Sequence, residues 1–422
     1  MPLVVQKFGG SSLSTPEHIR RVAERVARER AAGSDVVVVV SAMGDTTDNL
    51  LDLLRRITPR PAPREVDMLL STGEQVSIAL LASALVSVGC PAVSLVGWQA
   101  GIRTDEVGRK ARILAIDPTR VLRELAAGKV VVVAGFQGVS ASGEITTLGR
   151  GGSDTTAVAV AAALNADVCE IFSDVDGVYT ADPRVVPEAR RIPAIAYEEM
   201  MEMAQLGAQV LQIRAVECAA MHGVTIAARS TFSDGPGTRI ASLQEVSALD
   251  GPRTLESGAV ARAVAHERNV AKLALCGVPD RPGIAVQLFS ALAACHVNVD
   301  MIIQSQSREG RNDIAFTVGV DELEQAREAA LSVGQVVGAE EVVASDGYGK
   351  VSLIGAGMTS HPGVAATMFR ALADAGVNIE MISTSEIKIS CLVQAEQLQA
   401  AVRAVHHGFG LERPEAGAGA GA

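Results

Sequence analysis

The chain predicts an α/β fold with a mainly parallel sheet sandwiched by helices, followed by two smaller ferredoxin-like α+β modules. Three observations carry this prediction. Apolar strand-like runs alternate with helical segments over about the first half of the chain, aromatic residues make up only 3%, and a repeat with an offset of 80 residues occupies the C-terminal part. Aliphatic runs of this kind are typical of parallel strands that are buried on both faces.

The N-terminal elements follow from short local signals. Thr15 and Pro16 predict a helix start that continues to Gly33, because Thr caps a helix and Pro fits its first position. Met221-His222-Gly223 predicts a helix end. We expect strands over residues 3–7, 36–40, 91–96, 130–134, 168–173 and 224–228, and further helices over 66–88, 121–127 and 154–164.

The C-terminal part contains an internal duplication. Half of the aligned positions are identical between residues 282–305 and 362–385, which favours duplication over chance. Each copy reads as strand, Pro-Gly loop, helix and two further strands, with later strands over 314–318 and 388–393. The expected organisation is a first domain over 1–240, a linker over 241–267, modules over 268–343 and 344–412, and a disordered tail over 413–422.

Composition excludes several classes of protein. The formal net charge of −11 argues against nucleic acid or an anionic membrane as a partner. The six cysteines form no Cys-x-x-Cys pair and predict free thiols in a reducing cytoplasm, and the seven histidines show no metal-ligand spacing. The sequence contains no signal-peptide pattern and no apolar run of 18 residues.

Two glycine clusters predict a phosphate site. Lys7-Phe8-Gly9-Gly10 follows a strand, and Gly149-Arg150-Gly151-Gly152-Ser153-Asp154 precedes an Ala-rich helix that Ser153 or Asp154 is expected to cap. Backbone N–H groups of such loops, with a lysine, suit a polyphosphate. The spacing is not that of a P-loop. The alternatives are an ordinary strand-to-helix turn with an exposed lysine, and a surface arginine at position 150.

Two further features carry polar chemistry. Glu74 stands in an otherwise apolar helix and would need a cation, such as a substrate ammonium, if it is buried; the alternative is a solvated helix face. Residues 172–184 combine a hydroxyl, carboxylates, a tyrosine and an arginine after a buried strand, as a nucleoside pocket requires. The spacing there does not fit a calcium loop.

These three strings, Lys7 to Ser12, Gly149 to Asp154 and Ser173 to Arg184, together resemble the aspartate kinases, within the amino acid kinase family. The likeness covers nearly the whole chain. The duplication resembles paired ACT domains, the amino-acid-sensing modules of that family, and Ser383 to Ser390 strengthens this likeness.

The resemblance implies roles for individual residues. Lys7 and Asp154 would be catalytic, with ATP and Mg²⁺ as co-substrate and cofactor, and L-aspartate as acceptor. The substrate would contact Ser41, Thr47, Glu74, Arg150, Gly151, Gly152 and Ser153. The nucleotide would contact Lys7, Phe8, Gly9, Gly10, Ser173, Asp174, Tyr179, Asp182 and Arg184. No protein side chain is assigned as a metal ligand.

The paired modules imply feedback control by lysine, threonine or both; the alternative is that both repeats are purely structural dimerisation units. In the first copy the effector would contact Asp280, Arg281, Pro282, Gly283, Ile284, Ala285, Asn298, Val299, Asp300 and Gln304. In the second it would contact Val364, Ala365, Asn378, Ile379, Ser385 and Glu386. The resemblance also implies a homo-oligomer, or assembly with a shorter regulatory subunit, through the ACT modules.

The sequence departs from the family pattern at three places. Phe8 stands where Tyr is frequent, Ser173 where Thr is frequent, and Gln212-Ile213 where many relatives carry His-Pro before the arginine that is Arg214 here. Two other functions remain open: a catalytically silent amino-acid sensor, and a kinase of another small acid such as acetylglutamate or carbamate.

Overall fold

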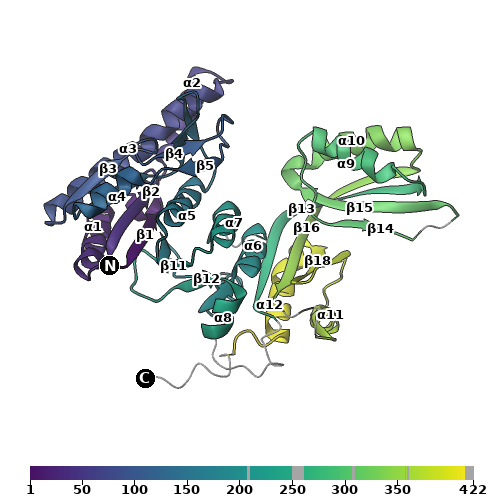
Figure 1. Cartoon of the computed structure of the whole chain (residues 1–422). Helices are drawn as coiled ribbons and strands as arrows, with labels where there is room; N and C mark the ends of the chain where they lie inside the picture. Colours follow the sequence, from purple (N-terminus) through teal and green to yellow (C-terminus); the bar gives the residue numbers. More distant parts are fainter. Residues whose placement is uncertain (207–209, 250–260, 307–308, 357, 359–360, 414–422) are drawn as a thin grey trace. The chain divides into compact units, whose positions relative to one another are not determined.

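The computed structural model describes residues 1–206, 210–249, 261–306, 309–356, 358 and 361–413 (Figure 1). Its internal contacts divide these residues into two compact units. Unit 1 holds residues 1–178, 191–205 and 210–249, and unit 2 holds residues 179–190, 206 and those from 261 onward. Segment 179–190 therefore groups with the C-terminal unit, although it lies well inside the first expected domain.

Unit 1 is built on an eight-stranded sheet in the order β10-β12-β11-β9-β1-β2-β6-β3. Neighbouring strands are parallel except β11 and β12, as predicted for buried valine-rich runs. The strands are β1 (Leu3–Phe8), β2 (Asp35–Val40), β3 (Ala92–Leu95), β6 (Val130–Ala134), β9 (Val168–Ser173), β10 (Ala194–Ala196), β11 (Ile226–Ser230) and β12 (Thr238–Ala241).

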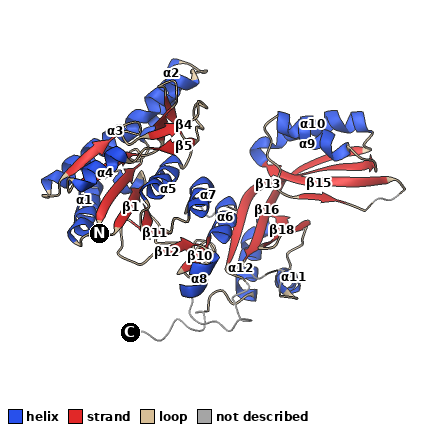
Figure 2. Cartoon of the chain, viewed as in Figure 1, coloured by secondary structure: helices blue, strands red, loops and turns tan. Residues whose placement is uncertain are grey.

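Helices cover both faces of this sheet (Figure 2). One side carries α1 (Pro16–Ala31) and α3 (Pro63–Ser87), which share an apolar cluster with β2 and β6. The other side carries α5 (Gly152–Leu164) and α7 (Ile213–His222), which pack against each other, and α4 (Thr119–Ala126) packs against β6. The expected start of α1 is confirmed, because the Thr15 side chain accepts a hydrogen bond from the His18 N–H. The expected end of α7 is also confirmed, because Gly223 after it has a left-handed backbone. The remaining helices are η1 (Ser11–Leu13), α2 (Thr46–Ile57), α6 (Tyr197–Gln205) and α8 (Leu243–Leu249).

A second, four-stranded sheet in unit 1 was not predicted. Its order is β5-β4-β7-β8, with β4 (Ile102–Thr104), β5 (Ile113–Ile116), β7 (Gln137–Val139) and β8 (Ile145–Thr147). Strands of three or four residues are too short to show an alternating pattern. The sheet matters because β8 leads directly into the glycine loop at 149–152.

Helix α3 is long and apolar enough to cross a membrane by length and composition alone, although the sequence contains no uninterrupted apolar run of that length. Core helices of globular domains pass the same test. Asp67 and Glu74 are both buried in unit 1, and α3 packs against α1, β3 and β6. We interpret α3 as a core helix of unit 1.

Unit 2 is built on a six-stranded antiparallel sheet in the order β14-β15-β13-β16-β18-β17. Both copies of the repeat have the predicted order of strand, helix and two strands. The strands are β13 (Ala263–Pro279), β14 (Ile302–Gln304), β15 (Arg311–Gly319), β16 (Glu341–Ile354), β17 (Met381–Thr384) and β18 (Lys388–Gln394). The helices are α9 (Ile284–Ala294), α10 (Leu323–Val337), α11 (Val364–Asp374) and α12 (Leu398–Gly408), with η2 (Val320–Glu322) and η3 (Ala395–Gln397).

The two modules share their central strands. In β13, residues 263–267 pair with 350–354 of β16, and residues 273–276 pair with 341–344. One long strand pair therefore runs through both modules. Residues 263–267 were expected at the end of the linker, and they are part of this strand.

Segment 179–190 packs into the core of the second module. Ala181, Val185 and Val186 are buried in the same apolar cluster as Met368 and Val402. Backbone bonds fix the segment there, since the Thr180 N–H donates to the Arg190 carbonyl and the Val264 N–H donates to the Thr180 carbonyl. The segment is therefore structurally part of unit 2.

A buried lysine joins the strands of unit 2. Lys350 on β16 is 2% exposed, and its Nζ lies 2.7 Å from Glu267 and within hydrogen-bond distance of Asp300. Burial works against its charge, but the two carboxylates outweigh burial and raise the pKa of Lys350. Asp300 was predicted to contact an effector, and here it neutralises Lys350.

We predict that Lys350→Met destabilises unit 2 by about 3 kcal/mol, because both carboxylates lose a buried partner. Hydrogen exchange of a peptide covering β16 measures the change. Lys272→Met is the matched control, since Lys272 sits on the neighbouring strand with a longer, more exposed ion pair to Glu380 at 3.6 Å. Equal exchange rates in the two variants would contradict the prediction.

Candidate functional site

The first glycine turn follows β1 and contacts the loop that follows β2. The Gly44 N–H donates to the Gly10 carbonyl at 3.0 Å, and the Ser41 N–H donates to the Phe8 carbonyl at 3.1 Å. A Cβ at Gly10 would lie 3.0 Å from the Ala42 carbonyl oxygen. This close approach brings two loops together at the carboxyl ends of parallel strands, where ligands bind in such sheets.

Lys7 and Asp154 form a buried ion pair at this edge. Lys7 Nζ lies 2.6 Å from Asp154 Oδ1, and the two residues are 9% and 7% exposed. Lys7 comes from β1 and Asp154 from the first turn of α5, so the pair joins the two glycine clusters. The two predicted catalytic residues are therefore in contact.

The second glycine cluster forms the turn between β8 and α5. Gly149 has φ +80° and Gly151 has φ +70°, a region that favours glycine. Helix α5 begins at Gly152 with Gly151 as its N-cap, so the prediction that Ser153 or Asp154 caps the helix is wrong. Both side chains lie inside the first turn, which frees Asp154 to pair with Lys7.

The loop after β6 also lies at the site, close to Ser153 and to the end of β2. This loop was not predicted from the sequence. A Cβ at Gly135 would lie 2.8 Å from Ser153 Oγ and 2.9 Å from the Val40 carbonyl oxygen. Phe136 follows with φ +67°, and its N–H donates to Thr156 Oγ1 at 3.1 Å. A glycine directly after a buried strand was the available signal.

Glu74 is buried with half of its carboxylate unsatisfied. It is 2% exposed, and its Oε1 accepts a hydrogen bond from the Ala42 N–H at 3.0 Å. Its Oε2 is buried without a hydrogen-bond partner. Burial raises the pKa of Glu74 to about 7, against backbone hydrogen bonds that lower it. One oxygen of Glu74, beside the 41–44 loop, is therefore left without a donor.

Three other predicted substrate residues are accessible. Arg150 is exposed and, among the described residues, makes no hydrogen bond or ion pair. Ser41 is half-buried before the loop, and Thr47 is half-buried in the first turn of α2. Their roles stay predictions.

The predicted nucleotide residues fall into two groups. Phe8 stacks on Phe172 with ring centroids 4.7 Å apart, Ser173 is the last residue of β9, and Asp174 follows that strand. Tyr179, Asp182 and Arg184 lie in the segment that belongs to unit 2. Asp182 pairs with Arg184 at 2.9 Å, and that hydrogen bond is the main cause of a lowered Asp182 pKa.

Asp67 is a second carboxylate in α3 that sequence reasoning missed. It is 1% exposed and accepts hydrogen bonds from Thr147 Oγ1 at 2.6 Å and from the Arg109 N–H at 3.0 Å. It lies seven residues before Glu74, which places both on one helix face. Asp67 thus fixes the end of β8, two residues before the glycine loop.

In unit 2, a cavity of about 330 Å³ contains most of the predicted first-copy effector residues. Its lining includes Asp280 and the turn that starts α9, with Asn312 and Ile314 from β15. The lining residues are Pro279, Asp280, Arg281, Pro282, Gly283, Ile284, Ala285, Gln304, Asn312 and Ile314. Asn312 was not predicted; its Nδ2 donates to Asp280 at 3.3 Å, and its Oδ1 is buried and unpartnered.

The other predicted effector residues do not line that cavity. Asn298, Val299 and Asp300 lie elsewhere, with Asp300 held by Lys350. In the second copy, Val364 is buried at the start of α11, while Asn378 donates to Glu380 at 3.3 Å. Ala365, Ile379, Ser385 and Glu386 likewise stay predictions.

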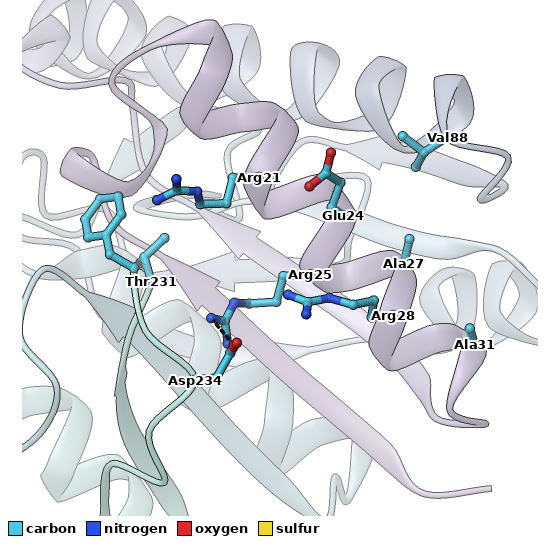
Figure 3. Close-up of a pocket in the computed structure, with 10 residues that line it drawn as sticks. Arg21, Glu24, Arg25, Ala27, Arg28, Ala31, Val88, Thr231 and Asp234 are labelled. Carbon is cyan, nitrogen blue, oxygen red and sulfur yellow. Dashed lines mark hydrogen bonds and ion pairs between the residues drawn. The ribbon is translucent and has the colours of Figure 1, made fainter.

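An arginine-lined groove lies on α1 (Figure 3), outside the predicted site. Arg21, Arg25 and Arg28 line it with Phe232 and Asp234, and its volume is about 760 Å³. Arg25 pairs with Asp234 at 2.9 Å, so part of the positive charge is neutralised within the chain.

The structure also brings two histidines to one carboxylate in unit 2, which the sequence spacing did not indicate. Glu412 Oε2 lies 3.9 Å from His406 Nδ1 and 3.7 Å from His407 Nδ1, and the three could together hold a metal ion. Arg413 lies 3.7 Å from the other oxygen of Glu412. That neighbouring cation weakens the case for a metal at this place.

Each of the six cysteines is free, as expected. Cys90, Cys169 and Cys391 are buried, whereas Cys295 is exposed.

Comparison with known proteins identifies the domains. Residues 2–228 match the amino acid kinase family, and residues 273–335 and 351–409 each match an ACT domain. A protein named aspartokinase from Mycolicibacterium smegmatis is 52% identical over 415 residues, which cover 97% of each chain. A protein named aspartate kinase from Pseudomonas putida is 50% identical over 414 residues, covering 98% of this chain and 99% of the relative.

A solved structure shares the architecture. Aspartokinase III from E. coli, in complex with aspartate and ADP, is 26% identical and has a TM-score of 0.77. The match covers 96% of this chain and 99% of that one.

The raised pKa of Glu74 predicts a pH-dependent effect on stability. The folded pKa of about 7 lies above the ordinary value of 4.5, so its contribution to stability is present below 4.5 and lost as the pH rises through 7. Glu74→Gln removes this loss. The variant should gain up to about 3 kcal/mol relative to wild type between pH 5 and pH 8.5.

Urea unfolding followed through Trp98, the single tryptophan of the chain and a residue of unit 1, measures this difference. Glu24→Gln on α1 is the control, because Glu24 is exposed. A stability difference that stays constant between pH 5 and pH 8.5 would show that Glu74 is ionised normally.

Proposed function

The chain belongs to the amino acid kinase family, and we propose that it transfers the γ-phosphoryl group of ATP to the side-chain carboxylate of L-aspartate, giving 4-phospho-L-aspartate. The single observation that carries this proposal is the buried Lys7–Asp154 pair between two glycine-rich loops. The aspartate kinase names of relatives that match along nearly the full length support the choice of substrate.

The acceptor needs no general base. The side-chain carboxylate of aspartate is an anion at neutral pH, so the obstacle is its repulsion from the ATP phosphates. Lys7 supplies a positive charge at the point of transfer, and the N–H groups of the glycine loops supply further donors. Asp154 holds the Lys7 ammonium over Gly9, where a Cβ would lie 3.3 Å from Nζ.

Mg²⁺ takes carboxylate oxygens together with phosphate oxygens. Asp154 is paired with Lys7, whereas Asp174 after β9 is exposed, so Asp174 would hold the ion together with the ATP phosphates. When bound, Mg²⁺ neutralises charge on the transferring phosphates.

Aspartate recognition follows from the unpaired groups of unit 1. Glu74 Oε2 is buried without a partner and would accept the substrate ammonium, which restores the ionised form of Glu74. Arg150 is exposed and would form a bidentate bond with the α-carboxylate. Ser41, Thr47 and the 151–153 backbone would complete the pocket.

Phe8 is fully buried in the core of unit 1, so the nucleotide would contact Gly9, Gly10, Ser173 and Asp174 there. The contacts predicted for Tyr179, Asp182 and Arg184 belong to segment 179–190, which is packed in the core of the second module.

Unit 2 would sense an amino acid such as lysine or threonine. The cavity at the start of α9 offers Asp280 for an ammonium, the unpartnered Asn312 Oδ1 as a further acceptor, and helix N–H groups for a carboxylate. A solved relative from E. coli contains lysine and aspartate, which supports lysine as a candidate. Coupling of about 1–3 kcal/mol would suffice for control.

A cytoplasmic location and assembly through the ACT modules, with a second copy or a shorter regulatory subunit, complete the proposal. The silent-sensor alternative is disfavoured because Lys7 and Asp154 are paired and Glu74 is buried in the site. The other alternative, a kinase of another small acid, is tested by comparing the rate of ADP release with aspartate, glutamate and acetylglutamate as acceptors. Turnover of another acid without turnover of aspartate would reject the proposal.

We predict that Lys7→Ala lowers kcat by about 10²–10³-fold, because it removes the charge between the two anionic reactants. Trapping of the acyl phosphate with hydroxylamine measures the rate. Lys129→Ala, which removes a half-exposed lysine of unit 1 paired with Glu124, is the control. Thermal unfolding is followed in parallel, since Asp154 loses its partner. A folded Lys7→Ala variant with near-normal turnover would overturn the role of Lys7.

We predict that Asp280→Asn raises the lysine or threonine concentration needed for half inhibition by about tenfold, corresponding to about 1.4 kcal/mol, while the uninhibited kcat stays unchanged. Asp321→Asn is the control, because Asp321 is exposed in the same module outside the cavity. Equal sensitivity of the two variants would exclude this cavity as the effector site.

A further inference from the structure

We propose that Arg214, together with Gln212, is a positioning residue that holds the glycine loop 149–152 in the shape required for phosphoryl transfer. The inference rests on the proposed function for its kinetic consequence, but the positioning itself is a property of unit 1. It gives a role to the 212–214 segment, where the sequence departs from the family pattern.

Arg214 clamps the chain just before the glycine loop. From the first turn of α7, its Nη1 donates to the Leu148 carbonyl at 2.6 Å and its Nη2 donates to the Ala111 carbonyl at 3.0 Å. The Ala111 N–H in turn donates to the Thr147 carbonyl at 3.0 Å. The planar fork of one guanidinium therefore ties the exit of β8 to the neighbouring 109–111 segment, with a rigid spacing between its two donors that a lysine ammonium lacks.

Gln212 supports the loop itself. A Cβ at Gly151 would lie 1.8 Å from Gln212 Cγ, so the Gln212 side chain packs directly against the backbone of Gly151. Gly151 is the N-cap of α5 and is left-handed. The contact therefore fixes the residue from which the helix carrying Ser153 and Asp154 starts.

The loop has few other attachments. Gly149 and Gly151 both have positive φ and no side chains, and Arg150 between them makes no bond within the described residues. Asp67 fixes the loop entrance through Thr147 and Arg109. Arg214 and Gln212 fix the stretch from Leu148 to Gly151. Without them, Arg150 and the loop N–H groups lose a defined position toward substrate.

The test combines kinetics with hydrogen exchange on the full-length protein. Arg214→Met should lower kcat/KM for aspartate by about 100-fold, with a much smaller change in KM for ATP, because misplacement of about 1 Å costs this much. The kcat/KM of Arg214→Lys for aspartate should lie between that of Arg214→Met and that of wild type. Gln212→Ala should also lower kcat/KM for aspartate, by a smaller factor than Arg214→Met does. Exchange of a peptide over 145–153 should be faster in all three variants.

Arg25→Met is the matched control. Arg25 is also a partly buried arginine of unit 1, and it donates to the Ser233 carbonyl and pairs with Asp234, far along the chain from the glycine loop (Figure 3). An Arg214→Met variant with the kcat/KM and loop exchange of Arg25→Met would overturn the inference. So would an equal rise of KM for both substrates that tracks a loss of folded protein, with Arg214→Lys no better than Met.

Failure of the proposed function would look different. Wild-type protein without aspartate turnover, but with faster loop exchange in Arg214→Met than in Arg25→Met, would reject the aspartate kinase proposal and support the positioning role. Wild-type protein that phosphorylates aspartate, together with unchanged loop exchange in Arg214→Met, would support the aspartate kinase proposal and reject the positioning role.

Discussion

The ion pair between Lys7 and Asp154 is the interaction on which the site depends. Two nearly buried charges are stable only because each satisfies the other, and their contact requires β1 and the start of α5 to lie in one fixed relation. Space is tight at both glycine clusters: a Cβ at Gly9 would lie 3.3 Å from Lys7 Nζ, and a Cβ at Gly151, the N-cap of α5, would lie 1.8 Å from Gln212 Cγ. The two glycine clusters therefore serve the packing around the pair as well as any bound phosphate.

Glu74 shows the complementary condition, a charge that the protein leaves incompletely paired. Its Oε1 is satisfied by the Ala42 N–H, while its Oε2 is buried without a donor, and burial raises its pKa to about 7. Asp67, on the same helix, is also buried but receives bonds from Thr147 and Arg109. The two carboxylates on α3 therefore differ: Asp67 fixes the loop entrance, and Glu74 keeps one oxygen unpaired, to which we assign the substrate ammonium as a proposal.

Unit 2 depends on a different constraint, the continuity of β13 and β16 through both modules. The two ACT modules share these strands, so their strands form one continuous sheet. Lys350 lies in this sheet and joins Glu267 to Asp300. Segment 179–190 is packed into the second module, so residues that resemble nucleotide contacts are carried by the unit that resembles an amino-acid sensor.

The sequence by itself determined the parallel sheet and the duplication, because valine runs and a repeat are local patterns. It also predicted a candidate site from lysine, glycine and carboxylate at strand ends. It missed the four-stranded sheet with β8, whose strands are too short to show periodicity, and it misplaced the cap of α5. Only the tertiary structure decided which polar groups meet. The Lys7–Asp154 contact, the unpartnered oxygen of Glu74 and the clamp of Arg214 on Leu148 each join residues far apart in the chain. Such pairings depend on how strands and helices pack, and no local pattern contains that information.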